Sequence, residues 1–262
     1  MKRIVAIALT AIMLLAAVSL AACGKETTKS IYDKTNEKML AVDAMEVKMD
    51  VQMDMTMAGQ TISSDMSYVI KTTGAKSDSP VGYADIEMDM LGQKVNVVSY
   101  VEGDYVYIYT MGEGMKLPKD SELAADYDTE ATLNAYEIDI PEEILEATEF
   151  TTDDDGNYVL AFDFNGQEHA DALKSLTDSI MAGMDTTLSG YEATIGDVKY
   201  VITVNKDDFT LETMKLEMTM DMTVEGMDVA VKVVADSEYL AFGDSVTITP
   251  PEGYQDFEEL VA

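Results

Sequence analysis

Residues 45–57 read MEVKMDVQMDMTM, a run in which every odd position is apolar and every even position is polar. Successive side chains of a β-strand point to opposite faces, so residues two apart share a face. Residues 45–57 are therefore predicted to form a long strand with a methionine-rich face toward the core and a polar face toward water. Residues 214–224, MKLEMTMDMTV, repeat this alternation and predict a second strand of the same kind.

A glycine follows a strand-like run at three places, within residues 55–60, 88–93 and 222–227. Glycine readily adopts the positive φ that tight hairpin turns require, so each place predicts a hairpin. Residues 112–139 show little periodicity and are expected to form a long loop with local structure. Shorter runs predict strands at residues 98–101, 105–110, 157–164, 191–195, 198–204 and 239–248, with a turn at Gly196-Asp197.

Helical spacing of apolar residues predicts three helices: residues 30–43, a short segment after Pro141, and residues 168–182. No strand–helix–strand crossover unit is apparent, and short turns join consecutive strands. These features favour an α+β fold, in which a large curved antiparallel sheet of about ten strands forms a half-barrel and a few helices cover its concave face. Residues 31–262 contain no linker rich in glycine, serine or proline, so one domain is expected there.

The N-terminus has the features of an export signal. Lys2 and Arg3 precede an apolar run over residues 4–18, and small residues follow. The sequence Leu-Ala-Ala-Cys at residues 20–23 resembles the lipobox of bacterial lipoproteins, in which the cysteine receives a diacylglycerol before cleavage. This resemblance implies a signal peptide over residues 1–22, a lipidated Cys23 and a tether over residues 23–30. The protein is then expected outside the cytoplasm, held to a membrane by the lipid on Cys23.

The net charge narrows the partners that this chain can have. The full sequence has a formal charge of −33 at pH 7, and removal of Lys2 and Arg3 with the signal peptide makes it −35. Nucleic acids bind through Lys and Arg and are excluded as partners. Most of the acids are expected to form a solvated face, although divalent cations or cationic partners could bind this acidic surface.

The chain contains 20 methionines and no tryptophan. Methionine packs adaptably and is common on surfaces that accept varied apolar partners. The lipobox, the strands at 45–57 and 214–224, the helix at 170–181 and the closing residues 246–252 are similar to the LolA-like superfamily of lipoprotein and lipid carriers, including LppX- and LprG-type lipoproteins. The resemblance implies a half-barrel around an apolar cavity that holds a lipid or acyl ligand, lined by Met49, Met53, Met55, Met218, Met220, Met222, Leu173, Leu176 and Ile180.

Two other interpretations stay open. The methionines could simply form the core of a structural or interaction lipoprotein of the envelope that has no ligand. The Met-x-Met-x-Met runs at residues 53–57 and 218–222 could also bind copper(I), which prefers thioether ligands, although no cluster of His or Cys supports such a site.

The sequence offers no recognisable catalytic site. His169 is the only histidine, Cys23 is expected to be acylated, and a glycine-rich phosphate loop is absent. The protein is therefore expected to be non-enzymatic and to need no cofactor or metal.

Overall fold

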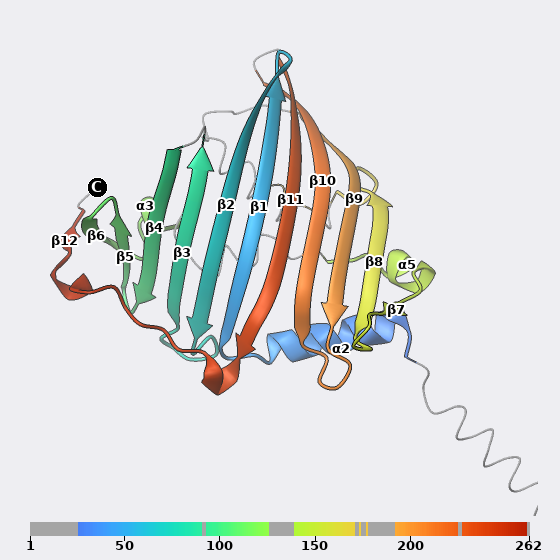
Figure 1. The fold of residues 1–262 in the computed structure, drawn as a ribbon, viewed down its shortest axis with the longest axis horizontal. Coiled ribbons are helices and arrows are strands. Elements are labelled where there is room, and N and C mark those ends of the chain that lie inside the picture. The colour runs from blue at the N-terminus through green and yellow to red at the C-terminus, as the bar shows by residue number, and fades with distance from the viewer. Residues whose placement is uncertain are drawn as a thin grey trace, which may run out of the picture.

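The computed structural model describes residues 26–90, 93–125, 139–170, 173, 177, 192–224 and 227–260. Within these ranges, twelve strands form one open curved sheet in the order β12-β6-β5-β4-β3-β2-β1-β11-β10-β9-β8-β7 (Figure 1). The helices are α2 (Thr28–Leu40), α3 (Glu122–Ala125) and α5 (Glu142–Ala147), with the short 3-10 helices η1 (Gly243–Ser245) and η2 (Tyr254–Asp256). The strands are β1 (Met45–Met57), β2 (Gln60–Thr73), β3 (Val81–Met90), β4 (Gln93–Glu102), β5 (Tyr105–Thr110), β6 (Glu113–Pro118), β7 (Thr151–Thr152), β8 (Tyr158–Asn165), β9 (Glu192–Val204), β10 (Leu211–Val224), β11 (Met227–Phe242) and β12 (Glu258–Glu259).

The sheet is built from two meanders of antiparallel strands. Each strand from β1 to β5 pairs with the next one along the chain, as does each strand from β7 to β10, and β1 pairs with β11 to join the two meanders. Among the strands that the structure describes, only β12 is parallel to its neighbour, β6. The predicted α+β class with a large antiparallel sheet is confirmed. The described sheet has twelve strands where about ten were expected, and two of the twelve, β7 and β12, have only two residues each.

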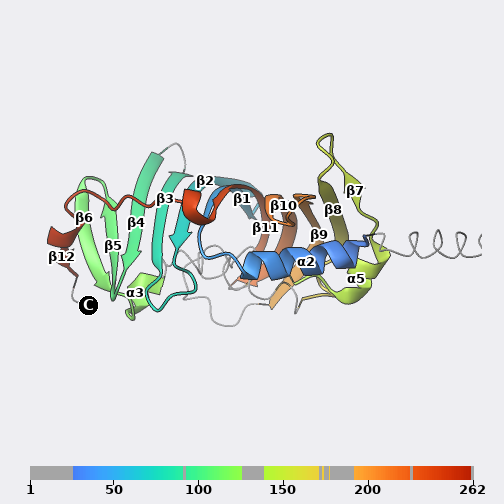
Figure 2. The same cartoon turned by 90° about the horizontal axis from the view of Figure 1, so that it is seen from below.

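Helix α2 packs on the apolar face of the sheet, and Figure 2 shows α2 and α5 on the same side. The hydroxyl oxygen of Thr27 accepts a hydrogen bond from the backbone N–H of Ser30 at 3.1 Å, which caps the first turn of α2. Ile31 and Tyr32 are buried, and the Tyr32 ring meets the edge of Phe162 with centroids 6.3 Å apart. The helices predicted at residues 30–43 and after Pro141 are thus present. Neither these nor any other described helix has the length and apolar character needed to cross a membrane.

The described side chains form two buried clusters on this apolar face. The larger cluster joins α2 and α5 to strands β8 to β11 and the adjoining parts of β1 to β3. The smaller cluster lies beneath β4 to β6, where Ala124 of α3 covers it. Its buried members are Val97, Val101, Val106, Ile108, Leu117 and Ala124.

Three of the expected local structures are wrong. No turn forms at Gly196-Asp197, because β9 continues through residues 192–204 with an irregularity in its pairing to β10. A Cβ atom at Gly196 would lie 2.3 Å from the hydroxyl of Thr219, so this glycine allows close approach of two strands and does not reverse the chain. Residues 239–242 prolong β11, and residues 243–245 form η1, so 239–248 is no separate strand. Residues 113–118 form β6 within the segment expected to be a loop.

The helix predicted at residues 168–182 lies largely outside the described residues. Residues 166–170 form a turn. Leu173 is described and belongs to the larger buried cluster.

Candidate ligand-binding site

One row of cross-strand neighbours on the apolar face shows where the side chains change from buried to partly exposed. The cross-strand pairs run from Val198 of β9 through Met218 of β10 and Val233 of β11 to Met53 of β1 and Ser64 of β2. The first three side chains are 0%, 1% and 1% exposed, whereas Met53 and Ser64 are partly exposed. In this row, the apolar face is therefore covered as far as β11 and becomes accessible at β1.

This boundary divides the residues that the sequence predicted to line a site. Met53 and Met55 are partly exposed and pack against the edge of the larger cluster. Leu176, Ile180 and Cys23 lie outside the described residues. The other predicted residues are buried within the larger cluster: Met49, Met218, Met220, Met222 and Leu173.

The accessible part of the apolar face lies between the two buried clusters. Met53 and Met55 of β1 form one side of it, and Met66 of β2 and Met88 of β3 pair directly across neighbouring strands. Ile86 packs against both clusters and marks the boundary between them. We call Met53, Met55, Met66 and Met88 the methionine seam.

Sequence reasoning did not select Met66 and Met88 as site residues. Both methionines lie in strands. The face of the sheet to which each side chain points can be assigned once the registers of the hairpins are known. Met66 lies opposite Val51 of β1, which places both methionines on the same face as Met53. The sequence contains the positions of these two methionines, but placing them beside Met53 requires the pairing of β1, β2 and β3.

The methionine seam presents little polarity. The phenol of Tyr68 donates a hydrogen bond to the sulfur of Met66 at 3.2 Å, and burial raises the pKa of Tyr68. A thioether is a weak acceptor, so this contact leaves the surface mainly apolar. Methionine side chains adjust their rotamers to irregular apolar shapes. The seam is therefore suited chemically to a flexible hydrocarbon ligand.

The two Met-x-Met-x-Met runs are separated in the sheet. Val229, Val231 and Val233 of β11 lie between residues 53–57 of β1 and residues 218–222 of β10. The two sets of sulfur atoms therefore belong to different strands that are not neighbours, so each run would have to bind copper(I) without the other.

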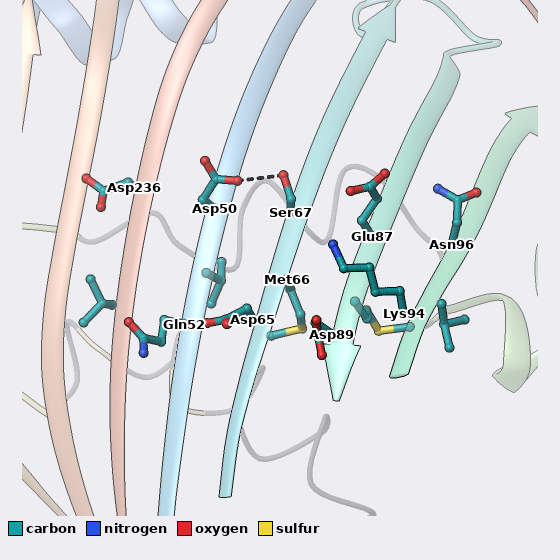
Figure 3. Close-up of a pocket in the computed structure, with 14 residues that line it drawn as sticks. Asp50, Gln52, Asp65, Met66, Ser67, Glu87, Asp89, Lys94, Asn96 and Asp236 are labelled. Carbon is teal, nitrogen blue, oxygen red and sulfur yellow. Dashed lines mark hydrogen bonds between the residues drawn. The ribbon is translucent and has the colours of Figure 1, made fainter. Parts of the chain in front are cut away.

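The opposite, polar face contains a groove of about 550 Å³ that spans β11, β1, β2, β3 and β4 (Figure 3). Asp50 lies directly opposite Asp236, and Asp65 lies directly opposite Asp89. Like charges facing each other across strands destabilise a sheet. The polar side chains that line the groove are Asp50, Gln52, Asp65, Ser67, Glu87, Asp89, Lys94, Asn96 and Asp236.

Local hydrogen bonds offset part of this repulsion. The hydroxyl of Ser67 donates to Asp50 at 2.6 Å and, together with Lys48, lowers the pKa of that carboxyl group. Lys215 lies 2.7 Å from Asp236. Within the described ranges, no group of three or more His, Cys, Asp or Glu residues is placed to hold a metal ion. The groove thus resembles a solvated acidic surface on which cationic groups would be favoured.

Asp65→Asn is expected to raise the free energy of unfolding by about 0.2–1 kcal/mol at low salt, because it removes one of two carboxylates that face each other. Asp65 is exposed, so high salt should reduce the gain. Urea denaturation at two salt concentrations measures it. Asp78→Asn, in the exposed turn between β2 and β3, is the matched control, and an equal gain there would contradict the assignment to the Asp65–Asp89 pair.

A protein-family model described as "Family of unknown function (DUF6612)" matches residues 27–256. No curated protein matches the chain. Similar solved structures include LprF from Mycobacterium bovis, at 12% identity over 86% of this chain and 97% of that chain, with a TM-score of 0.40. A DUF1329 family protein from Desulfovibrio piger is 12% identical over 85% of this chain and 96% of its own, with a TM-score of 0.27. A putative outer membrane lipoprotein-sorting protein domain from Vibrio parahaemolyticus is 10% identical over 82% and 94%, with a TM-score of 0.21.

Proposed function

The chain belongs to DUF6612, a family of unknown function, and we propose that it is a non-enzymatic lipoprotein that binds or carries an apolar ligand on the methionine seam. Cys23 would hold it by a lipid to the outer side of a membrane. The ligand class is a lipid or another molecule with acyl chains.

The exposure of the methionine seam carries this proposal. A core side chain stabilises the fold most when it is fully removed from water, as Met218 and Met220 are. Met53, Met55, Met66 and Met88 remain partly exposed although they adjoin two buried clusters. A bound hydrocarbon would complete their burial. The LolA-like resemblance of the sequence leads to the same ligand class.

The anchor rests on the sequence of the first 23 residues. The basic start, the apolar run and Leu20-Ala21-Ala22-Cys23 have the features of a lipoprotein signal. Helix α2 begins at Thr28, so only a short polar tether separates Cys23 from the sheet and its helices. The ligand-binding part would therefore remain close to the membrane from which it could take a lipid.

The decisive experiment uses residues 24–262, produced in the native host with an unlipidated export signal. Native mass spectrometry and extraction should find a stoichiometric apolar molecule, and the emptied protein should take up a fluorescent fatty acid. Met66→Gln with Met88→Gln should weaken that uptake roughly tenfold or more, which corresponds to a loss of about 1.4 kcal/mol.

Val69→Gln is the matched control, because Val69 is also partly exposed and lies on β2 but faces the polar side. This change should leave uptake unaltered. A protein that is empty as isolated and takes up no fatty acid would overturn the proposal. This result would favour the second candidate function, an envelope lipoprotein without an apolar ligand. In that case the acidic groove would bind cationic partners, and the methionines would serve only as core residues.

A further inference from the structure

The C-terminal residues cross the polar face and pack on tyrosines of the first meander. After β11 the chain runs past the ends of β1 to β4 to reach the far edge of the sheet (Figure 1). The Tyr254 ring meets Tyr100 and Tyr107 edge to face, with centroids 5.0 and 4.9 Å apart. Its hydroxyl donates a hydrogen bond to Glu102 at 2.8 Å. We call residues 250–260 the C-terminal strap.

A second aromatic side chain holds the C-terminal strap against β5 and β6. The Phe257 ring stacks on Tyr109 with centroids 6.2 Å apart. It occupies the space above Gly114, where a Cβ atom would lie 2.4 Å from the ring. Glycine at position 114 therefore makes room for Phe257, and the two residues form a matched contact between β6 and the strap.

The strap ends as a strand along the edge of β6. Strand β12 pairs in parallel with Met115 and Lys116, and the backbone N–H of Leu260 donates to the carbonyl oxygen of Lys116 at 3.0 Å. The backbone of Lys116 thus faces outward from the sheet. Pro118, two residues further on, faces the same way and has no N–H to offer. Two separate features therefore limit strand pairing at this edge.

We propose that the C-terminal strap is a detachable guard that prevents β6 from pairing with β6 of a second copy of this chain. An uncovered edge strand presents unpaired backbone donors and acceptors to other strands. Two β6 strands related by a two-fold axis would run antiparallel, which is the pairing mode of nearly all neighbours in this sheet. The second copy is therefore the partner that fits the uncovered edge.

The attachment of the strap suits a guard that can be released. Its ladder with β6 involves only the two residues of β12, whose side chains are exposed. Leu260, which follows the ladder, is 45% exposed and adds little burial. Tyr254 and Phe257 thus provide most of the contact, and loss of these two rings should release the strap while β6 itself stays unchanged.

The test compares the unlipidated chain from residue 24 with its Tyr254→Ser, Phe257→Ser variant by sedimentation over a range of concentrations. The variant is expected to form a dimer with a dissociation constant at least tenfold lower than that of the parent chain. Gly114→Val should have the same effect, because the new side chain takes the place of the Phe257 ring while the strap sequence is intact. Circular dichroism checks that each variant keeps the sheet.

Adding Lys116→Pro separates edge pairing from adhesion of the uncovered tyrosines. Proline at this outward-facing position removes a donor needed by an incoming strand and leaves pairing with β5 intact. The proline should therefore return the variant to the association of the parent chain. Equal association with and without Lys116→Pro, or no gain in association in both strap-releasing variants, would overturn the proposal.

Discussion

Met218→Ala is expected to lower the free energy of unfolding by about 2–5 kcal/mol, the range for truncating a buried methionine to alanine. Met218 is 1% exposed and lies between Val198 and Val233 in the larger buried cluster. The truncation would leave a cavity bounded by strands that cannot move independently of the sheet. Urea denaturation followed by circular dichroism measures the change.

Met53→Ala is the matched control, because Met53 is the other cross-strand neighbour of Val233. Met53 is partly exposed, so its truncation removes less buried apolar surface. We expect it to lower the free energy of unfolding by less than half as much as Met218→Ala. Under the proposed function, this variant should instead weaken fatty-acid uptake. Equal destabilisation by the two truncations would show that both methionines are ordinary core residues and would contradict the division of the apolar face.

Cys23→Ala is expected to abolish membrane attachment. Under the lipoprotein hypothesis the thiol accepts the diacylglycerol, and two acyl chains are needed for stable anchoring. Without the thiol, the chain should appear as an unlipidated precursor or as released protein. Cell fractionation and intact mass measurement follow both outcomes, since lipidation adds mass and cleavage removes residues 1–22.

Lys25→Ala is the control for the anchor, because it changes the tether just after Cys23 and leaves residues 20–23 intact. This variant should stay with the membrane fraction. If Cys23→Ala kept the mass and membrane retention of the parent chain, the anchor would have to be something other than a lipid on this residue.

Much of the fold could be predicted because its longest strands have one apolar face toward the core and one polar face toward solvent. Alternation over residues 45–57 and 214–224 identified β1 and β10 almost to their ends. Glycine at the ends of such runs located the hairpins that join β1 to β2, β3 to β4, and β10 to β11. Antiparallel pairing then followed, because strands joined by short turns must run in opposite directions.

The errors arose where a residue acts through a neighbour that is distant in sequence. Local sequence predicts a turn at Gly196, but the role of this glycine depends on Thr219 of the adjacent strand. Strand β6 has weak alternation, and pairing with β5 and β12 stabilises it as a strand. The contact of Phe257 with Gly114 likewise joins segments that local periodicity cannot relate.

The sequence by itself determined which side chains share a face, because period two is a local property of the extended chain. It therefore placed the methionines of β1 and β10 on apolar faces and the acids on polar ones. The two strands look alike at this level, and only the tertiary structure distinguished them. Met218 is covered on all sides, whereas Met53 lies where the cover ends and adjoins Met66 and Met88. Accessibility depends on which elements pack above a face, and that arrangement is set by contacts between segments far apart in the chain.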